Sequence, residues 1–126
     1  MDGALRILVV EDEMTIALSI EDMLVELGHQ VIDLAMRLPQ ALELARAADF
    51  DLAILDVNLD GRMSFPIAEA LDDRGLPYIF VTGYGSAGVD PAYRKDAIVI
   101  QKPFDLTDLR GSIDRLLSAR GGCTAK

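Results

Sequence analysis

Short apolar runs alternate with segments of helical spacing along the whole chain. Five runs rich in isoleucine and valine occur, at residues 6–10, 30–35, 51–55, 78–81 and 97–101. Four of them are nearly continuous in apolar residues, which is typical of parallel strands covered on both faces rather than of strands with one face in water. The pattern therefore predicts five strands of one buried sheet.

The segments between the runs carry helical patterns. After the first run, apolar residues recur with i, i+4, i+7 spacing from Ile16 to Leu27, and Gly28 is placed to end that helix. Further helices are expected over 38–48, from Pro66 to Gly75, and after Asp105. The inward positions of the last one are predicted to be Leu106, Leu109, Ile113, Leu116 and Leu117. Residues 82–96 permit only a shortened fourth helix, because they contain several glycines and Pro91.

Five alternations of strand and helix with right-handed crossovers predict an α/β fold, with an open doubly wound sheet and helices on both faces. The chain has 126 residues, which fits one domain. In such sheets the functional crevice lies at the carboxyl ends of the strands, near the switch in strand order. Functional residues are therefore sought just after each apolar run.

The amino-acid composition argues against some classes of function. The chain has 51% hydrophobic residues, and its 12 basic against 21 acidic residues give a formal charge of −9. This charge argues against binding to nucleic acid or to an anionic membrane. The single cysteine excludes an internal disulfide, and neither a membrane-length apolar run nor a signal peptide is recognisable. We expect a soluble cytoplasmic protein.

Polar side chains follow four of the runs. Glu11 and Asp12 follow the first, Asp56 the third, Thr82 the fourth and Lys102 the fifth. Carboxylates that converge on one sheet edge need a compensating cation, and Mg²⁺ is the hard cation that commonly assists phosphoryl transfer. An aspartate nucleophile with Mg²⁺, a hydroxyl and an ammonium would make an aspartyl-phosphate site.

Each of these residues also has a plain structural explanation. Acidic residues commonly begin helices, an aspartate after a strand often caps a turn, and Thr82 or Lys102 taken alone fits an ordinary strand or surface position. All of them, however, fall at the carboxyl ends of different strands in one alternating fold. Together they favour a functional site.

Four motifs in this order resemble the receiver domain of bacterial two-component response regulators. They are RILVVEDE, LAILDVNLDG, IFVTG and QKPF, and the resemblance spans about residues 6–117. It implies a flavodoxin-like (βα)5 fold with strand order 2-1-3-4-5. It also implies a phosphorylation-dependent signalling switch that catalyses only its own phosphorylation and dephosphorylation.

The resemblance assigns roles residue by residue. Asp56 corresponds to the phosphoacceptor. Asp12, Asp56 and the backbone carbonyl of Asn58 would hold Mg²⁺, which Mn²⁺ or Ca²⁺ can replace, and Glu11 would act through a bound water. Thr82 and Lys102 would bind the phosphoryl oxygens, and a cis peptide is expected after Lys102.

The implied partners are a histidine kinase or histidine phosphotransfer protein and a downstream protein, for a monomer or weak homodimer. Too little sequence follows Leu117 for an output domain, so a single receiver domain with a core of about residues 5–119 is expected.

Two features depart from typical receivers. Val99 stands where they carry a switch tyrosine or phenylalanine, and the segment between Thr82 and Lys102 is short and rich in glycine. With the motif PYIFVTGYG, these features resemble a subgroup of stand-alone alphaproteobacterial receivers, some of which serve stress-response phosphorelays. Without a switch ring at Val99, we expect the segment containing Tyr84 to rearrange on phosphorylation, or Tyr84 to cover the site.

Other readings stay open. A haloacid-dehalogenase-like phosphatase also uses an aspartate nucleophile with Mg²⁺, but it needs a second aspartate where Asn58 stands. A binding module that works without phosphorylation is the third reading, together with a flavodoxin-like cofactor carrier. No glycine-rich phosphate loop follows the first run, which argues against a nucleotide or flavin.

Overall fold

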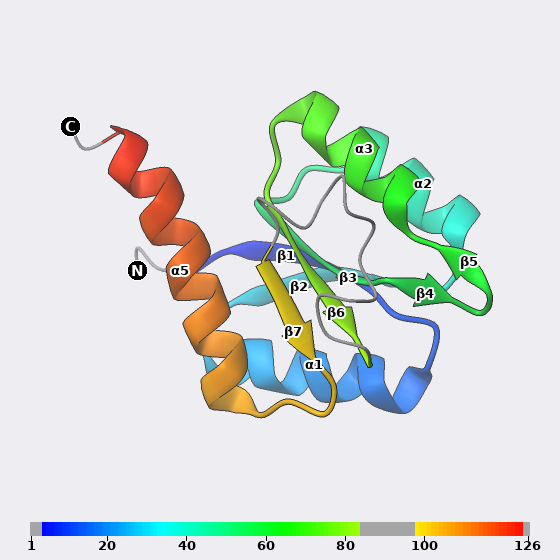
Figure 1. The fold of residues 1–126 in the computed structure, drawn as a ribbon, viewed down its shortest axis with the longest axis horizontal. Coiled ribbons are helices and arrows are strands. Elements are labelled where there is room, and N and C mark those ends of the chain that lie inside the picture. The colour runs from blue at the N-terminus through cyan, green and yellow to red at the C-terminus, as the bar shows by residue number, and fades with distance from the viewer. Residues whose placement is uncertain (1–3, 84–97, 125–126) are drawn as a thin grey trace.

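In the computed structural model, residues 4–83 and 98–124 are described, with side chains of the last helix as far as Ser118. Five parallel strands form one sheet in the order β2-β1-β3-β6-β7, which is the predicted order 2-1-3-4-5 (Figure 1). The strands are β1 (Arg6–Val10), β2 (Gln30–Ala35), β3 (Leu52–Asp56), β6 (Tyr78–Thr82) and β7 (Ile98–Gln101). The predicted flavodoxin-like sheet is confirmed.

Helices cover both faces of the sheet. Within the described part of the chain they are α1 (Met14–Glu26), α2 (Leu38–Ala47), α3 (Phe65–Arg74) and α5 (Leu106–Thr124). In Figure 1, α1 and α5 lie on one side and α2 and α3 on the other. Alternate residues of β1 serve the two layers, because Ile7 and Val9 pack with the α1 and α5 side, whereas Leu8 and Val10 pack with the α2 and α3 side. A strand buried on both faces explains the continuous apolar runs.

Several details differ from the prediction, among them the end of β6, which includes Thr82 although the predicted run ends at residue 81. The third strand occupies Leu52–Asp56 rather than 51–55, since Asp51 instead accepts a 2.8 Å hydrogen bond from the Arg6 backbone N–H. Helix α2 ends at Ala47, one residue early. Leu117, expected to face inward, is 39% exposed, because the end of α5 extends past the sheet. The predicted shortened fourth helix lies outside the described residues.

A small antiparallel hairpin follows β3 and was not predicted. Strands β4 (Asn58–Leu59) and β5 (Arg62–Met63) are joined by Asp60 and Gly61, which both have positive φ, 53° and 89°. An Asp-Gly pair is a strong signal for a two-residue hairpin turn, so the sequence did carry the information. The Gly61 backbone N–H also donates to Asn58 Oδ1 at 2.7 Å. The hairpin is therefore held closed two residues after Asp56.

In the part of the chain that the structure describes, no helix combines the length and the apolar character that crossing a bilayer requires.

Candidate functional site

Strand register brings the predicted site residues to one edge of the sheet. Val10 pairs with Leu55, so Glu11 follows β1 at the level where Asp56 ends β3. Asp56 pairs with Val81, the residue before Thr82, and Thr82 pairs with Gln101, the residue before Lys102. The Lys102 backbone N–H also donates to the Thr82 carbonyl at 2.9 Å. Residues far apart in sequence are thus neighbours because parallel strands end together.

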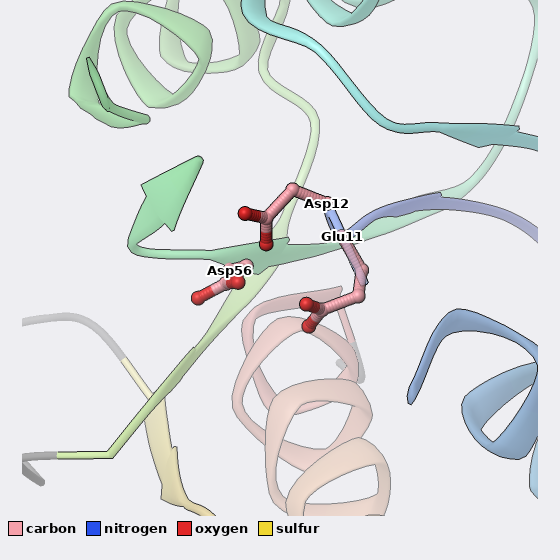
Figure 2. Close-up of side chains that lie close together, drawn as sticks. All are labelled: Glu11, Asp12 and Asp56. Carbon is pink, nitrogen blue, oxygen red and sulfur yellow. The ribbon is translucent and has the colours of Figure 1, made fainter. Parts of the chain in front are cut away.

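Three carboxylates form a compact cluster at this edge. One oxygen each from Glu11, Asp12 and Asp56 lies within 4.8 Å of the other two, and Figure 2 shows the three side chains gathered beyond β1 and β3. Glu11 is only 1% exposed and Asp56 only 6%, whereas Asp12 is half-buried. Like charges this close are unfavourable unless cations or protons offset them.

Lys102 supplies one positive charge to the cluster. Its Nζ lies 3.1 Å from Glu11 Oε1 and 3.3 Å from Asp56 Oδ2. The Glu11 contact lacks hydrogen-bond geometry, so the buried Oε1 accepts no hydrogen bond from the described residues, while Oε2 accepts one from the Glu13 backbone N–H at 3.2 Å. One ammonium against three carboxylates leaves the site negative. It also leaves the buried Oε1 of Glu11 without a hydrogen bond from the described residues.

Burial, together with the neighbouring charges, shifts the pKa values of the clustered groups. Burial, and after it the charge of Asp56, raise the pKa of Glu11 from 4.5 to about 7. Burial also raises the pKa of Asp56, although Lys102 opposes the change. Burial alone would lower the pKa of Lys102, but Asp56 and Glu11 outweigh it and raise that pKa. The metal-free cluster therefore takes up protons at a higher pH than separate exposed carboxyl groups would.

Glu11→Gln should stabilise the metal-free protein in mildly alkaline solution. The pKa of Glu11 in the folded chain, about 7, exceeds its ordinary value of 4.5. Ionisation between these values therefore costs folding free energy, and the cost is complete above the folded pKa and absent below the ordinary one. Glutamine removes it. At roughly pH 8 we expect a gain of about 3 kcal/mol, or on the order of 10 °C in melting temperature.

Calorimetry with a chelator present measures this gain. The exposed Glu26 gives the matched control, Glu26→Gln, which should leave the melting temperature unchanged. The gain from Glu11→Gln should vanish toward about pH 4, where both side chains are neutral. A gain that stays constant across this range would contradict the electrostatic explanation.

The remaining predicted residues differ in how far they are buried and in what they contact. Thr82 is 3% exposed and sits at the end of β6. Asn58 is exposed, and its backbone N–H makes a long 3.4 Å hydrogen bond to Asp56 Oδ1. The peptide between Lys102 and Pro103 is cis, as expected. Val99 is half-buried and packs against the core on the α2 and α3 side, while Tyr84 lies outside the described residues.

The geometry fits a hard divalent cation. Glu11, Asp12 and Asp56 offer oxygen donors only, which Mg²⁺, Mn²⁺ and Ca²⁺ accept, and the buried Oε1 of Glu11 accepts no hydrogen bond from the residues described. Asp56 can also act as a nucleophile beside the Lys102 ammonium. The arrangement can therefore bind a cation and form an acyl phosphate at the same edge.

Comparison with known proteins identifies relatives that match most of this chain. The family model of the response regulator receiver domain matches residues 7–114. The phyllosphere-induced regulator PhyR of Methylorubrum extorquens is 30% identical over 92% of this chain and 45% of its own length.

Solved structures of response regulators are similar to this chain in fold. The response regulator PhyR from Brucella abortus is 28% identical over 96% of this chain and 51% of that chain, with a TM-score of 0.82. SdrG from Sphingomonas melonis Fr1 is 39% identical over 93% of this chain and 99% of that chain, also with a TM-score of 0.82. SdrG in its BeF3-activated conformation is similar to this chain with a TM-score of 0.76, at 38% identity over 89% of this chain and 95% of that chain. The chain spans about half the length of the curated relatives it matches, 45% and 57% for the first two.

Proposed function

Because the chain belongs to the response regulator receiver domain family, we propose that it is a phosphorylation-dependent switch whose phosphoacceptor is Asp56. The observation that carries the proposal is that Asp56 lies close to two further carboxylates and to the Lys102 ammonium at one edge of the sheet. Receiver domains are signalling modules rather than enzymes with a separate substrate. The residues proposed to take part in phosphorylation are Glu11, Asp12, Asp56, Thr82 and Lys102.

In the proposed reaction, a carboxylate oxygen of Asp56 attacks phosphorus. The bond from phosphorus to the donor's imidazole nitrogen breaks, and the acyl phosphate remains on Asp56. Lys102 is within 3.3 Å of Asp56 Oδ2, so its ammonium can pair with a phosphoryl oxygen. Thr82 can donate its hydroxyl to another one. These two groups offset negative charge where the phosphoryl group arrives.

Mg²⁺ is the proposed cofactor, and Mn²⁺ or Ca²⁺ can replace it. Asp12 and Asp56 would hold it together with the Asn58 backbone carbonyl, and Glu11 would hold a bound water. The buried Oε1 of Glu11, which accepts no hydrogen bond from the described residues, and the oxygen-only donors support this set. When bound, the ion neutralises charge on the phosphoryl oxygens.

Acetyl phosphate provides the direct test. With Mg²⁺ present, intact-mass spectrometry should show one added phosphoryl group per chain, because one nucleophilic aspartate lies beside the cation donors. No adduct would refute the switch and favour a binding module that works without phosphorylation. Turnover of p-nitrophenyl phosphate would instead favour the haloacid-dehalogenase-like phosphatase. We expect none, because Asn58 cannot serve as its general acid.

Magnesium affinity should fall as the solution becomes acidic. Burial and the charge of Asp56 hold the pKa of Glu11 at about 7, so below this value a cation must displace a proton from the cluster. We expect the dissociation constant to rise by up to about tenfold for each pH unit below neutrality and to level off above it. Isothermal titration calorimetry at several pH values measures this. An affinity that is independent of pH would show that the cation binds elsewhere.

The partners are proposals as well. A histidine kinase or histidine phosphotransfer protein would supply the phosphoryl group, and a second protein would read the phosphorylated form. The PhyR stress response regulator is similar to this chain, which supports a stress-response phosphorelay. The charge of −9 supports proteins rather than nucleic acid as partners.

A further inference from the structure

A groove runs between α2 and the β4–β5 hairpin, outside the carboxylate site. Its volume is about 720 Å³, and its lining includes Leu38, Pro39 and Leu42 from α2. Leu38 and Leu42 are half-buried because they also pack on the core beneath them, whereas Pro39 is exposed. The groove therefore has an apolar floor that remains partly open to solvent.

Two arginines border this floor. Arg46, from the last turn of α2, and Arg62, from β5, line the same groove, and both are exposed. Among the described residues neither arginine side chain makes an ion pair or a hydrogen bond. Arg6 and Arg74 differ, since Arg6 pairs with Asp49 at 2.7 Å and Arg74 donates to the Ala45 carbonyl at 2.7 Å. Glu43 is the one acidic side chain in the lining.

The charge of the groove contrasts with that of the whole chain. Acidic residues outnumber basic ones by 21 to 12, yet here two arginines face one glutamate. The groove also starts at Leu38, the first residue of α2, where the free N–H groups of the helix add positive potential. An acidic segment would find unpaired cations here, whereas most of the molecule would repel it.

We infer that this groove docks an acidic amphipathic helix of a partner protein. Apolar side chains of that helix would cover Leu38, Pro39 and Leu42, and its carboxylates would pair with Arg46 and Arg62. Helix α2 has ten residues and is about 15 Å long, enough to support roughly three turns of a partner helix.

The groove lies next to the site. Helix α2 starts three residues after β2, which ends level with β1, and Figure 1 shows the hairpin at the same edge of the sheet as the ends of β1 and β3. Arg62 belongs to the hairpin whose Asn58 backbone N–H is bonded to Asp56. A docked helix would therefore touch the segment that directly follows the proposed phosphoacceptor.

A synthetic peptide tests the inference on the unphosphorylated chain. The probe is an 18-residue helix with leucines at i, i+3, i+4 and i+7 and glutamates on its other faces, and its lysine counterpart is the control. In NMR titrations at low salt, the acidic peptide should shift amides of α2 and the hairpin. The double variant Arg46→Glu/Arg62→Glu should weaken binding at least tenfold, and added salt should weaken binding to the parent chain.

A matched variant separates the groove from overall charge. Arg110→Glu/Arg115→Glu makes the same change in charge at exposed positions on α5, across the sheet from α2, and should leave the affinity within twofold. Absence of binding, equal loss in both variants, or equal binding of the lysine peptide at the same residues would overturn the inference. Shifts that depend on protein concentration without peptide would assign the groove to a second copy and also overturn it. Because Asp56 is not phosphorylated in this experiment, its failure leaves the proposed function standing.

Discussion

Asp56→Asn should abolish the phosphoryl adduct formed with acetyl phosphate. An amide lacks the nucleophilic carboxylate oxygen, and the other two carboxylates of the cluster follow a different strand. We expect the labelled fraction to fall at least about a hundredfold, to the background of the mass measurement. The substitution removes a buried charge at a residue only 6% exposed, so the fold should persist.

Asp60→Asn is the matched control for this prediction. Asp60 is exposed in the hairpin turn, and asparagine tolerates its positive φ of 53°. The control should be phosphorylated like the parent chain. If the full adduct persists in Asp56→Asn, another residue accepts the phosphoryl group and the assignment is wrong.

Asp12→Ala should weaken magnesium binding by about a hundredfold or more, since even outer-shell partners of a metal site are worth roughly tenfold to a hundredfold. It removes one of three carboxylates but leaves the 3.3 Å contact between Lys102 and Asp56 untouched. Phosphorylation by acetyl phosphate should slow in proportion at limiting Mg²⁺. Calorimetric titration at about pH 8 separates this loss from the proton competition expected in acid.

Glu13→Ala is the control for the metal prediction. Glu13 is exposed at the start of α1, and only its backbone N–H reaches the cluster. Its magnesium affinity should equal that of the parent chain. If Asp12→Ala binds Mg²⁺ as tightly as the parent, the cation does not lie among these carboxylates.

Most of the fold could be predicted because burial on both faces leaves a simple pattern in sequence. Strands β1 and β2 start and end where the apolar runs do, and the order of the five strands is the one expected of the family. The misplaced start of β3 has a tertiary cause, since Asp51 is held by Arg6 from another strand. Leu117 fits the helical repeat, but only the position of α5 on the sheet decides that it is exposed.

For the candidate site as well, some features could be predicted from the sequence and others depend on the tertiary structure. The sequence by itself determined which side chains stand at or just after the carboxyl ends of the strands, because these ends can be read approximately from the apolar runs and parallel strands end at one edge. Only the tertiary structure decided that Lys102 reaches both Glu11 and Asp56, and that burial holds the pKa of Glu11 near 7. It also placed Arg46 and Arg62, from a helix and a hairpin, along one groove. Distances, burial and electrostatic shifts depend on how separate elements pack, and this packing has no local signature in sequence.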